Sequence, residues 1–338
     1  MTSSAPVRVL ITHSFPNAAI QTLHDISPRL EIEYFPAREL EDLKESWPEA
    51  EVLYTVDLLP TPEQAPSLRW VQGHFAGIDH FVGHPLASQV QLTTVSGIHT
   101  PEVGEYVMGM ILAFSHHLPQ ILHYQARAEW PSDRLDQFVP RELRGTTLGI
   151  VGYGSLGREI ARVAQVFGMT VLATKRDARH LADDGWRLEG TGDAQADVVR
   201  RIYPPQALKS MLGECEYVVL TVPLTDETLQ LIGSAELKAM KPDSVLVNVS
   251  RGRVLDEAAL ARALRDGSLA GAALDVFETE PLPQDSPLWG IPNVILSPHV
   301  SGFTTHYDTR ALSVFESNLR RYLQGETLLN LVDIQRGY

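Results

Sequence analysis

Cysteine is almost absent from this chain, because Cys215 is the only one among 338 residues. A single thiol forms no disulfide within the chain. This excludes the small secreted proteins that depend on disulfides and indicates a reducing compartment. A chain of this length buries enough apolar surface to fold without such bonds. We therefore expect a cytoplasmic protein of about two domains, with Cys215 at the edge of a core and not a reactive thiol.

Long apolar runs and an excess of positive charge are also missing. No apolar run approaches the roughly 18 residues that span a bilayer, and the N-terminus shows no signal-peptide pattern, so we expect no membrane association. Lysine and arginine number 28 against 42 aspartate and glutamate residues, which gives a formal net charge of −14. Nucleic acid is therefore not an expected partner, since phosphate binding requires clustered cations.

Metal-binding patterns are missing as well. Of the 12 histidines, several cluster between residues 74 and 117. No pair among these shows zinc-ligand spacing together with a third ligand, and the neighbours His116 and His117 point in different directions on a helix. The sequence therefore predicts no metal site.

Short apolar runs alternate with helical patterns along most of the chain, and this alternation predicts parallel sheets covered by helices on both faces. Helices are expected at residues 17–26, 159–167, 256–265 and 308–323. The expected strands fall into two series, at residues 7–11, 30–34, 52–56 and 70–73, and then at 148–151, 170–173, 217–222, 244–249, 270–276 and 294–296.

Two segments lie outside this alternation. From about Pro101 to His123 the chain is mostly apolar, which predicts one long helix with Thr100 as its N-cap, buried between domains or subunits. Residues 178–205 are polar, contain three glycines and end in Pro204-Pro205. This composition predicts an inserted surface loop.

A glycine motif, Gly152-Tyr153-Gly154-Ser155-Leu156-Gly157, follows a predicted strand and opens a predicted helix. In this context the pattern predicts a dinucleotide-binding turn. Gly152 permits the tight turn, Gly154 lets the backbone approach a pyrophosphate, and Gly157 allows close packing of helix on strand. The amides of Ser155 and Leu156 are then expected to point at the phosphates from the helix N-terminus.

The strand after this motif ends in Lys175-Arg176. NAD-specific sites usually have an acidic residue near this position, which binds the ribose 2′-hydroxyl. Two cations favour a 2′-phosphate instead, so the cofactor expected is NADP or NAD, with NADP favoured. Asp177 leaves NAD open.

Three charged residues follow the ends of predicted strands, where α/β sheets bind ligands. Arg251 lies in Ser250-Arg251-Gly252, Glu280 precedes Pro281, and His299 follows Pro298. An arginine binds an anionic substrate and polarises its carbonyl. A histidine exchanges a proton with the substrate oxygen, and a carboxylate beside it favours the protonated ring. This set suits carbonyl reduction.

These motifs, in this order, resemble the D-isomer-specific 2-hydroxyacid dehydrogenase family over nearly the whole chain. The resemblance implies that Arg251 binds the substrate and that His299 is the general acid/base paired with Glu280. It implies that the backbone amides of Ala76 and Gly77, in the loop Phe75–Asp79, bind the substrate carboxylate. It also implies cofactor contacts at Thr100, Val222, Pro223, Ser250 and Asp275. The sequence departs from the family at Lys175-Arg176 and in the length of the 178–205 insertion.

The expected fold is therefore α/β, with two Rossmann-like domains of parallel sheets flanked by helices and an active-site cleft between them. Residues 1–100 plus 299–338 are expected to bind the substrate and residues 101–298 the dinucleotide. The resemblance implies a homodimer that transfers a hydride between NAD(P)H and a small 2-oxo or 2-hydroxy acid, such as glyoxylate or hydroxypyruvate. A regulatory protein that senses NAD(H) and a phosphite dehydrogenase remain alternatives, and the sequence does not identify the acid.

Overall fold

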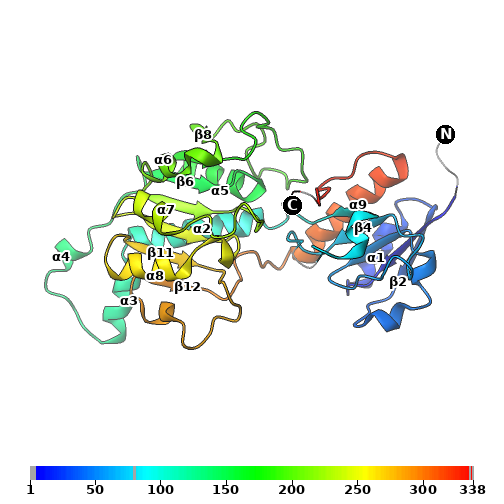
Figure 1. Ribbon diagram of the computed structural model, residues 1–338, viewed down its shortest axis with the longest axis horizontal. Helices are drawn as coiled ribbons and strands as arrows, with labels where there is room; N and C mark the ends of the chain where they lie inside the picture. Colours follow the sequence, from blue (N-terminus) through cyan, green and yellow to red (C-terminus); the bar gives the residue numbers. More distant parts are fainter. Residues whose placement is uncertain (1–4, 79–80, 335, 337–338) are drawn as a thin grey trace. The chain divides into compact units, whose positions relative to one another are not determined.

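The computed structural model describes residues 5–78, 81–334 and 336, and the chain divides into two compact units (Figure 1). The first unit comprises residues 1–98, 184–188 and 304–338, and the second comprises residues 99–183 and 189–303. The substrate-binding and dinucleotide-binding roles of the two units are proposals, to which we return below.

The first unit contains one parallel sheet with the strand order β2-β1-β3-β4-β5. One face of β1 packs on α9, where Phe315 and Leu319 are buried, and its other face packs on Leu43 and Trp47. Strands covered on both faces are typical of parallel sheets. The elements are β1 (Val7–Ile11), α1 (Asn17–His24), β2 (Leu30–Tyr34), β3 (Val52–Thr55), β4 (Trp70–Gly73), β5 (Gln91–Thr93) and α9 (Tyr307–Gln324).

The second unit contains a seven-stranded sheet with the order β12-β11-β10-β9-β6-β7-β8, in which every neighbouring pair is parallel. The chain adds strands on one side of β6 and then on the other, so the order reverses next to β6. Open α/β sheets bind ligands at the carboxyl ends of the strands beside such a reversal. The strands are β6 (Thr147–Val151), β7 (Thr170–Thr174), β8 (Arg201–Tyr203), β9 (Tyr217–Leu220), β10 (Val245–Asn248), β11 (Gly271–Leu274) and β12 (Val294–Leu296).

Helices cover both faces of this second sheet (Figure 1). Val107 and Ile160 join one hydrophobic core with β6, and Leu212 and Leu260 join the other with β10. Among the residues that the structure describes, no helix combines the length and the apolar character needed to cross a membrane. The helices are α2 (Thr100–Ser115), α3 (Leu118–Ala126), α4 (Arg134–Gln137), α5 (Ser155–Val166), α6 (Leu208–Leu212), α7 (Ser234–Ala239) and α8 (Glu257–Arg265).

The single long helix predicted from Pro101 to His123 is wrong, because the chain forms α2 and then α3. His117 adopts the left-handed conformation, with φ at 56°, and separates the two helices. Pro119, in the first turn of α3, lacks the N–H that a continuous helix would use. Thr100 is the first residue of α2 and His99 is its N-cap, so the predicted cap is also displaced by one residue.

The insertion at 178–205 is more than the surface loop that its composition predicts. Residues Arg201–Tyr203 form β8, which extends the sheet by pairing with β7. Asp193 is buried and accepts a hydrogen bond from the Tyr153 hydroxyl at 2.6 Å. The buried Arg158 side chain donates to the backbone carbonyls of Leu181 and Asp193. Buried polar groups are normally paired in this way, so the insertion is anchored to the second unit.

The division into units differs from the expected domain boundaries at three places, the first of which is residues 99–100, in the second unit. Residues 184–188 lie in the first unit, where Trp186 packs against its core and donates its backbone N–H to Asn330 Oδ1 at 2.9 Å. Residues 299–303 lie in the second unit, because the Asp275 carboxylate accepts hydrogen bonds from the amides of Val300 and Ser301, each at 2.9 Å.

The lone thiol is part of a core. Cys215 is fully buried, and its Sγ donates to the backbone carbonyl of Met211 at 3.1 Å. Burial raises the pKa of Cys215 to about 12. Because the thiolate is the reactive form, this residue is inert near neutral pH.

Candidate active site

The glycine turn joins β6 to α5 at the carboxyl end of β6, a central strand of the second sheet. Gly152 has a φ of 105°, a backbone conformation that residues with a Cβ atom rarely adopt. A Cβ atom on Gly152 would lie 2.8 Å from Val222 Cγ1, and one on Gly157 would lie 2.4 Å from the Gly152 carbonyl oxygen. The Thr221 hydroxyl donates to that same carbonyl at 2.6 Å. Close packing therefore fixes the turn and requires glycine at both positions.

The middle glycine of this turn faces open space. Gly154 is exposed, and a Cβ built on it would meet no atom of the described residues within 4 Å. It is the N-cap of α5, whose first turn contains Ser155 and Leu156. An exposed helix N-terminus without side-chain obstruction is a binding site for phosphate. The turn therefore fits the pyrophosphate of a dinucleotide, with Val222 packed beside it and Pro223 next in the chain.

The end of β7 is cationic. Lys175 is half-buried, and burial, assisted by the nearby Arg158, lowers its pKa. Arg176 is exposed and pairs with Glu227 at 2.9 Å. The Asp177 carboxylate is used within its own loop, where it accepts from the Arg179 amide and pairs with His180 Nδ1, each at 2.9 Å. Two cations therefore follow β7, and the carboxylate after them is already hydrogen-bonded within its own loop.

The turn after β10 holds Arg251. Asn248, at the end of the strand, accepts hydrogen bonds from the Ser250 amide at 3.0 Å and the Ser250 hydroxyl at 2.7 Å, and its amide donates to the Arg251 carbonyl. Arg251 Nη1 donates to the Ser250 carbonyl at 2.8 Å. A Cβ on Gly252 would lie 1.8 Å from the Phe277 carbonyl carbon, so this turn packs directly on the segment that leads to Glu280.

Glu280 and His299 form a hydrogen-bonded pair after the two neighbouring strands β11 and β12. Glu280 Oε2 lies 2.8 Å from His299 Nδ1, and Glu280 Oε1 accepts from the Phe277 amide at 3.0 Å. The carboxylate therefore fixes the imidazole orientation through one ring nitrogen. The other nitrogen, Nε2, is then positioned for proton exchange on a side chain that is 49% exposed.

His299 has a strained backbone that is held by hydrogen bonds. Its φ is 53°, an uncommon conformation for histidine, and its amide donates to the Asp275 carbonyl at 2.9 Å. Such strain is often found at functional sites. The buried Asp275 carboxylate holds the loop on both sides of His299, because Oδ1 accepts from Ser297 Oγ at 2.6 Å and Oδ2 from the Ser301 amide at 2.9 Å.

Sequence reasoning did not find this anchoring role of Asp275, nor the contribution of Tyr106. The Tyr106 hydroxyl lies 2.6 Å from Ser297 Oγ and extends the hydrogen-bonded chain from Asp275 into α2. Burial raises the pKa of Tyr106. The expected contact of Asp275 with the cofactor stays a prediction.

The structure brings Glu280 and His299 into contact and places Arg251, Glu280 and His299 after the adjacent strands β10, β11 and β12. Thr100 is buried in the first turn of α2, in the same unit. Ala76 and Gly77 are half-buried in a bend after β4, in the first unit, and Asp79 of that loop lies outside the described residues.

Comparison with known proteins shows which family the middle of the chain matches. Residues 108–301 match the family model described as D-isomer specific 2-hydroxyacid dehydrogenase, NAD binding domain. The chain is 34% identical over 297 residues to a glyoxylate reductase of Aeropyrum pernix, an alignment that covers 84% of this chain and 83% of that protein.

Solved structures resemble the whole chain. A D-isomer specific 2-hydroxyacid dehydrogenase from Xanthobacter autotrophicus Py2, in complex with NADPH and MES, is 27% identical with a TM-score of 0.80 and covers 99% of this chain and 100% of its own. An NADPH-dependent glyoxylate/hydroxypyruvate reductase from Sinorhizobium meliloti, in complex with NADP and sulfate, is 25% identical with a TM-score of 0.78 and covers 98% of this chain and 100% of its own.

Proposed function

This chain belongs to the D-isomer specific 2-hydroxyacid dehydrogenase family, and on that premise we propose that it reduces glyoxylate, hydroxypyruvate or a similarly small 2-oxo acid. It is an oxidoreductase that uses a nicotinamide dinucleotide, and it has a two-unit α/β fold. The observation that carries the proposal is the Glu280–His299 pair at 2.8 Å, set on strand ends next to the Arg251 turn and in the same sheet as the glycine turn.

In the proposed mechanism each of the charged residues has one task. The nicotinamide, when bound, supplies a hydride to C2 of the 2-oxo acid or accepts one from the 2-hydroxy acid. Arg251 binds the substrate carboxylate and polarises the carbonyl at C2. His299 Nε2 donates a proton to the carbonyl oxygen as that oxygen gains negative charge, and Glu280 positions the ring through its contact with Nδ1. The amides of Ala76 and Gly77 are proposed as further donors to the carboxylate.

A substrate panel tests this function. The purified protein is assayed with glyoxylate, hydroxypyruvate, pyruvate and phosphite, each with both cofactors. We expect turnover with the smallest 2-oxo acids. Cofactor binding without turnover of any 2-oxo acid would contradict the proposal and favour an NAD(H)-sensing regulatory protein, and turnover of phosphite alone would favour that alternative. The relatives described above are reductases or dehydrogenases of 2-oxo or 2-hydroxy acids, so we propose neither alternative.

We also propose that NADP is preferred over NAD, because Lys175 and Arg176 follow β7 while the Asp177 carboxylate is already bound within its own loop. Replacing both cations with alanine is expected to raise the KM for NADPH by about 10- to 100-fold, since charge-assisted hydrogen bonds to a phosphate are lost. The KM for NADH should change little. Steady-state kinetics with both cofactors measures this, and the exposed Arg179→Ala is the control. An equal effect on both cofactors would contradict the preference.

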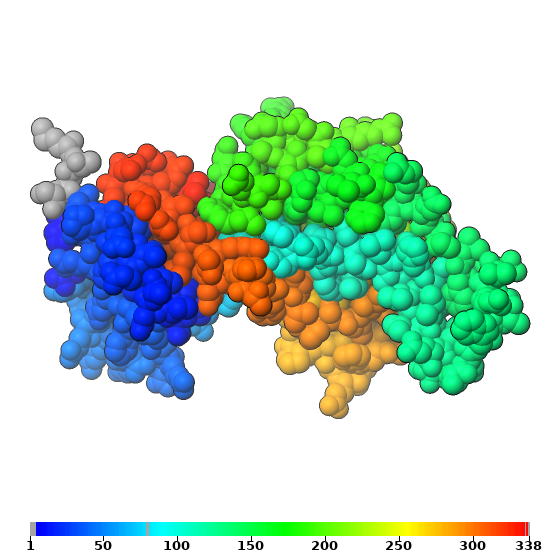
Figure 2. All heavy atoms as spheres, turned by 180° about the vertical axis from the view of Figure 1, so that it is seen from behind, coloured from blue at the N-terminus to red at the C-terminus, as the bar shows by residue number. Residues whose placement is uncertain are grey.

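The chain is further proposed to form a cytoplasmic homodimer. Several exposed apolar side chains belong to α3, α4 and the segments around them, and this part of the chain extends from the rest of the second unit (Figures 1 and 2). Trp130 is 84% exposed, and apolar patches of this kind mark interfaces. The other members are Leu118, Ile121, Leu122, Leu135 and Val139.

A charge in this patch is expected to break the dimer. Leu122→Asp places a carboxylate in the proposed interface, where burying an unpaired charge is costly. Light scattering after gel filtration should report a dimer for the parent chain and mostly monomer for the variant. Val166→Asp, at an exposed apolar position on α5, is the matched control and should stay dimeric. If Leu122→Asp remained as dimeric as the parent chain, the interface would have to lie elsewhere.

A further inference from the structure

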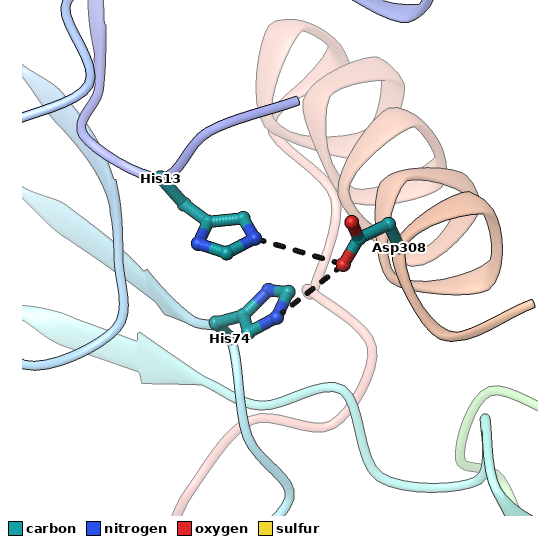
Figure 3. Close-up of side chains that lie close together, drawn as sticks. All are labelled: His13, His74 and Asp308. Carbon is teal, nitrogen blue, oxygen red and sulfur yellow. Dashed lines mark ion pairs between the residues drawn. The ribbon is translucent and has the colours of Figure 1, made fainter. Parts of the chain in front are cut away.

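Two histidines and an aspartate converge at one edge of the first unit, where His74 lies two residues before Ala76 (Figure 3). His13 Nε2 and His74 Nε2 each lie 3.6 Å from Asp308 Oδ1, and these three atoms lie within 4.8 Å of one another. His13 follows β1, His74 follows β4 and Asp308 is in the first turn of α9. The three residues therefore come from separate elements of a sheet edge where parallel strands present their carboxyl ends.

The two imidazoles are arranged as ligands. His13 Nε2 is buried and has no hydrogen-bond partner among the described residues, although it points toward the carboxylate. An unsatisfied buried polar atom is costly unless something else binds it. His74 is buried as well, and its Nε2 lies at the same distance from the same Asp308 oxygen.

A second layer of contacts holds His74 in place. The hydroxyl of the fully buried Tyr54 lies 2.8 Å from His74 Nδ1. A metal-binding histidine usually donates its other ring N–H to a fixed partner, which sets the tautomer and leaves the first nitrogen for the ion. The Tyr307 hydroxyl also donates to the His74 carbonyl at 3.2 Å, which fixes the backbone at this position.

The charge of the cluster favours a cation over an anion. The Asp308 carboxylate is equally close to both imidazoles, so an anion placed between the two rings would be repelled by it. A divalent cation is attracted by the same carboxylate and coordinated by both rings. Two histidines and one carboxylate with further positions open form a ligand set that Zn²⁺ and other divalent transition metals use.

We propose that His13, His74 and Asp308 form a binding site for a divalent transition metal ion, Zn²⁺ by ligand type, with at least one coordination position left open to water. Nitrogen and oxygen ligands bind Zn²⁺ at about 2.0–2.2 Å, and the present separations allow an ion to sit among them with small side-chain movements. The ion would cross-link β1, β4 and α9, and thereby stabilise the first unit when bound. The three proposed ligands are distinct from Arg251, Glu280 and His299, the residues to which the mechanism assigns substrate binding and proton exchange.

Metal binding to the full-length protein tests the site. The protein is stripped with a chelator and titrated with Zn²⁺ by calorimetry and with Co²⁺ by visible absorption. We expect one ion per chain, Co²⁺ bands of a low-coordinate nitrogen and oxygen site, and a raised melting temperature. His13→Ala and Asp308→Asn should each weaken binding by about 100-fold or more, and Tyr54→Phe by about 10- to 100-fold. His180→Ala is the matched control, because His180 pairs with Asp177 at the exposed end of another loop.

The outcomes separate the possibilities. Equal affinity for Zn²⁺ in the parent chain and in Asp308→Asn would overturn the proposal, provided that circular dichroism shows both proteins to be folded. Loss of binding in His180→Ala but not in His13→Ala would assign the ion to the other loop and overturn it as well. Because the readouts are metal affinity and melting temperature, they stand or fall separately from the oxidoreductase assays.

Discussion

Replacing His299 with glutamine is expected to lower kcat by about 100- to 10,000-fold, the usual contribution of a positioned general acid/base. Glutamine keeps a side chain of similar length but exchanges no proton. The Nδ1 contact to Glu280 at 2.8 Å identifies the other nitrogen as the one that serves the substrate. Turnover of the best 2-oxo acid is measured at saturating substrate and cofactor. We expect the affinity for the cofactor, measured by fluorescence quenching, to change little.

Two further variants make this result specific. Glu280→Gln keeps an oxygen that can accept from the Phe277 amide but removes the charge beside the ring, so a smaller loss of kcat is expected. The exposed His306→Gln is the control for replacing a histidine in the same stretch of chain. A His299→Gln protein that retains full turnover would refute the assignment of this residue as the acid/base.

Arg251 is expected to have the second large effect. Arg251→Gln should lower kcat/KM for the 2-oxo acid by about 100- to 1,000-fold, comparable to the loss of one donor that stabilises a developing oxyanion. The reason is that the side chain both binds the substrate carboxylate and polarises the carbonyl, so a neutral amide weakens both interactions. Initial rates over a range of substrate concentrations separate the KM and kcat contributions.

The control for this experiment is two residues away. Arg253 is exposed and lies in the same turn, so Arg253→Gln removes an equal charge without reaching the proposed substrate position. Arg251→Lys should recover only part of the activity, because an ammonium group lacks the planar pair of donors. If Arg251→Gln and Arg253→Gln had the same small effect, the substrate carboxylate would have to be bound elsewhere.

Local motifs allowed much of this structure to be predicted. The glycine turn at Gly152 could be anticipated because its constraints act between residues close in sequence, and the alternation of strands and helices follows from burial on both faces of a sheet. The strand β8 was missed because it is short, lies at the sheet edge and is surrounded by polar residues. The break at His117 was missed because the apolar pattern continues on either side of it.

Contacts between segments that are distant in the chain could not be predicted from the sequence. The hydrogen bonds that the Asp275 carboxylate accepts from the loop around His299 depend on two strands that lie side by side only in the folded sheet. The expectation of no metal site rested on spacing along the chain. The cluster of His13, His74 and Asp308 instead depends on β1, β4 and α9 meeting in space, which no local spacing reveals.

The path of the insertion has a consequence for protein engineering. Because residues 184–188 belong to the first unit while their flanks belong to the second, neither unit is a continuous module that can be exchanged with a relative. A chimera that takes residues 99–303 from this chain also imports Trp186, whose partners, including Asn330, come from the other parent. Recombination at residues 98 and 303 alone would therefore join mismatched surfaces, and successful hybrids should inherit 184–188 together with the first unit.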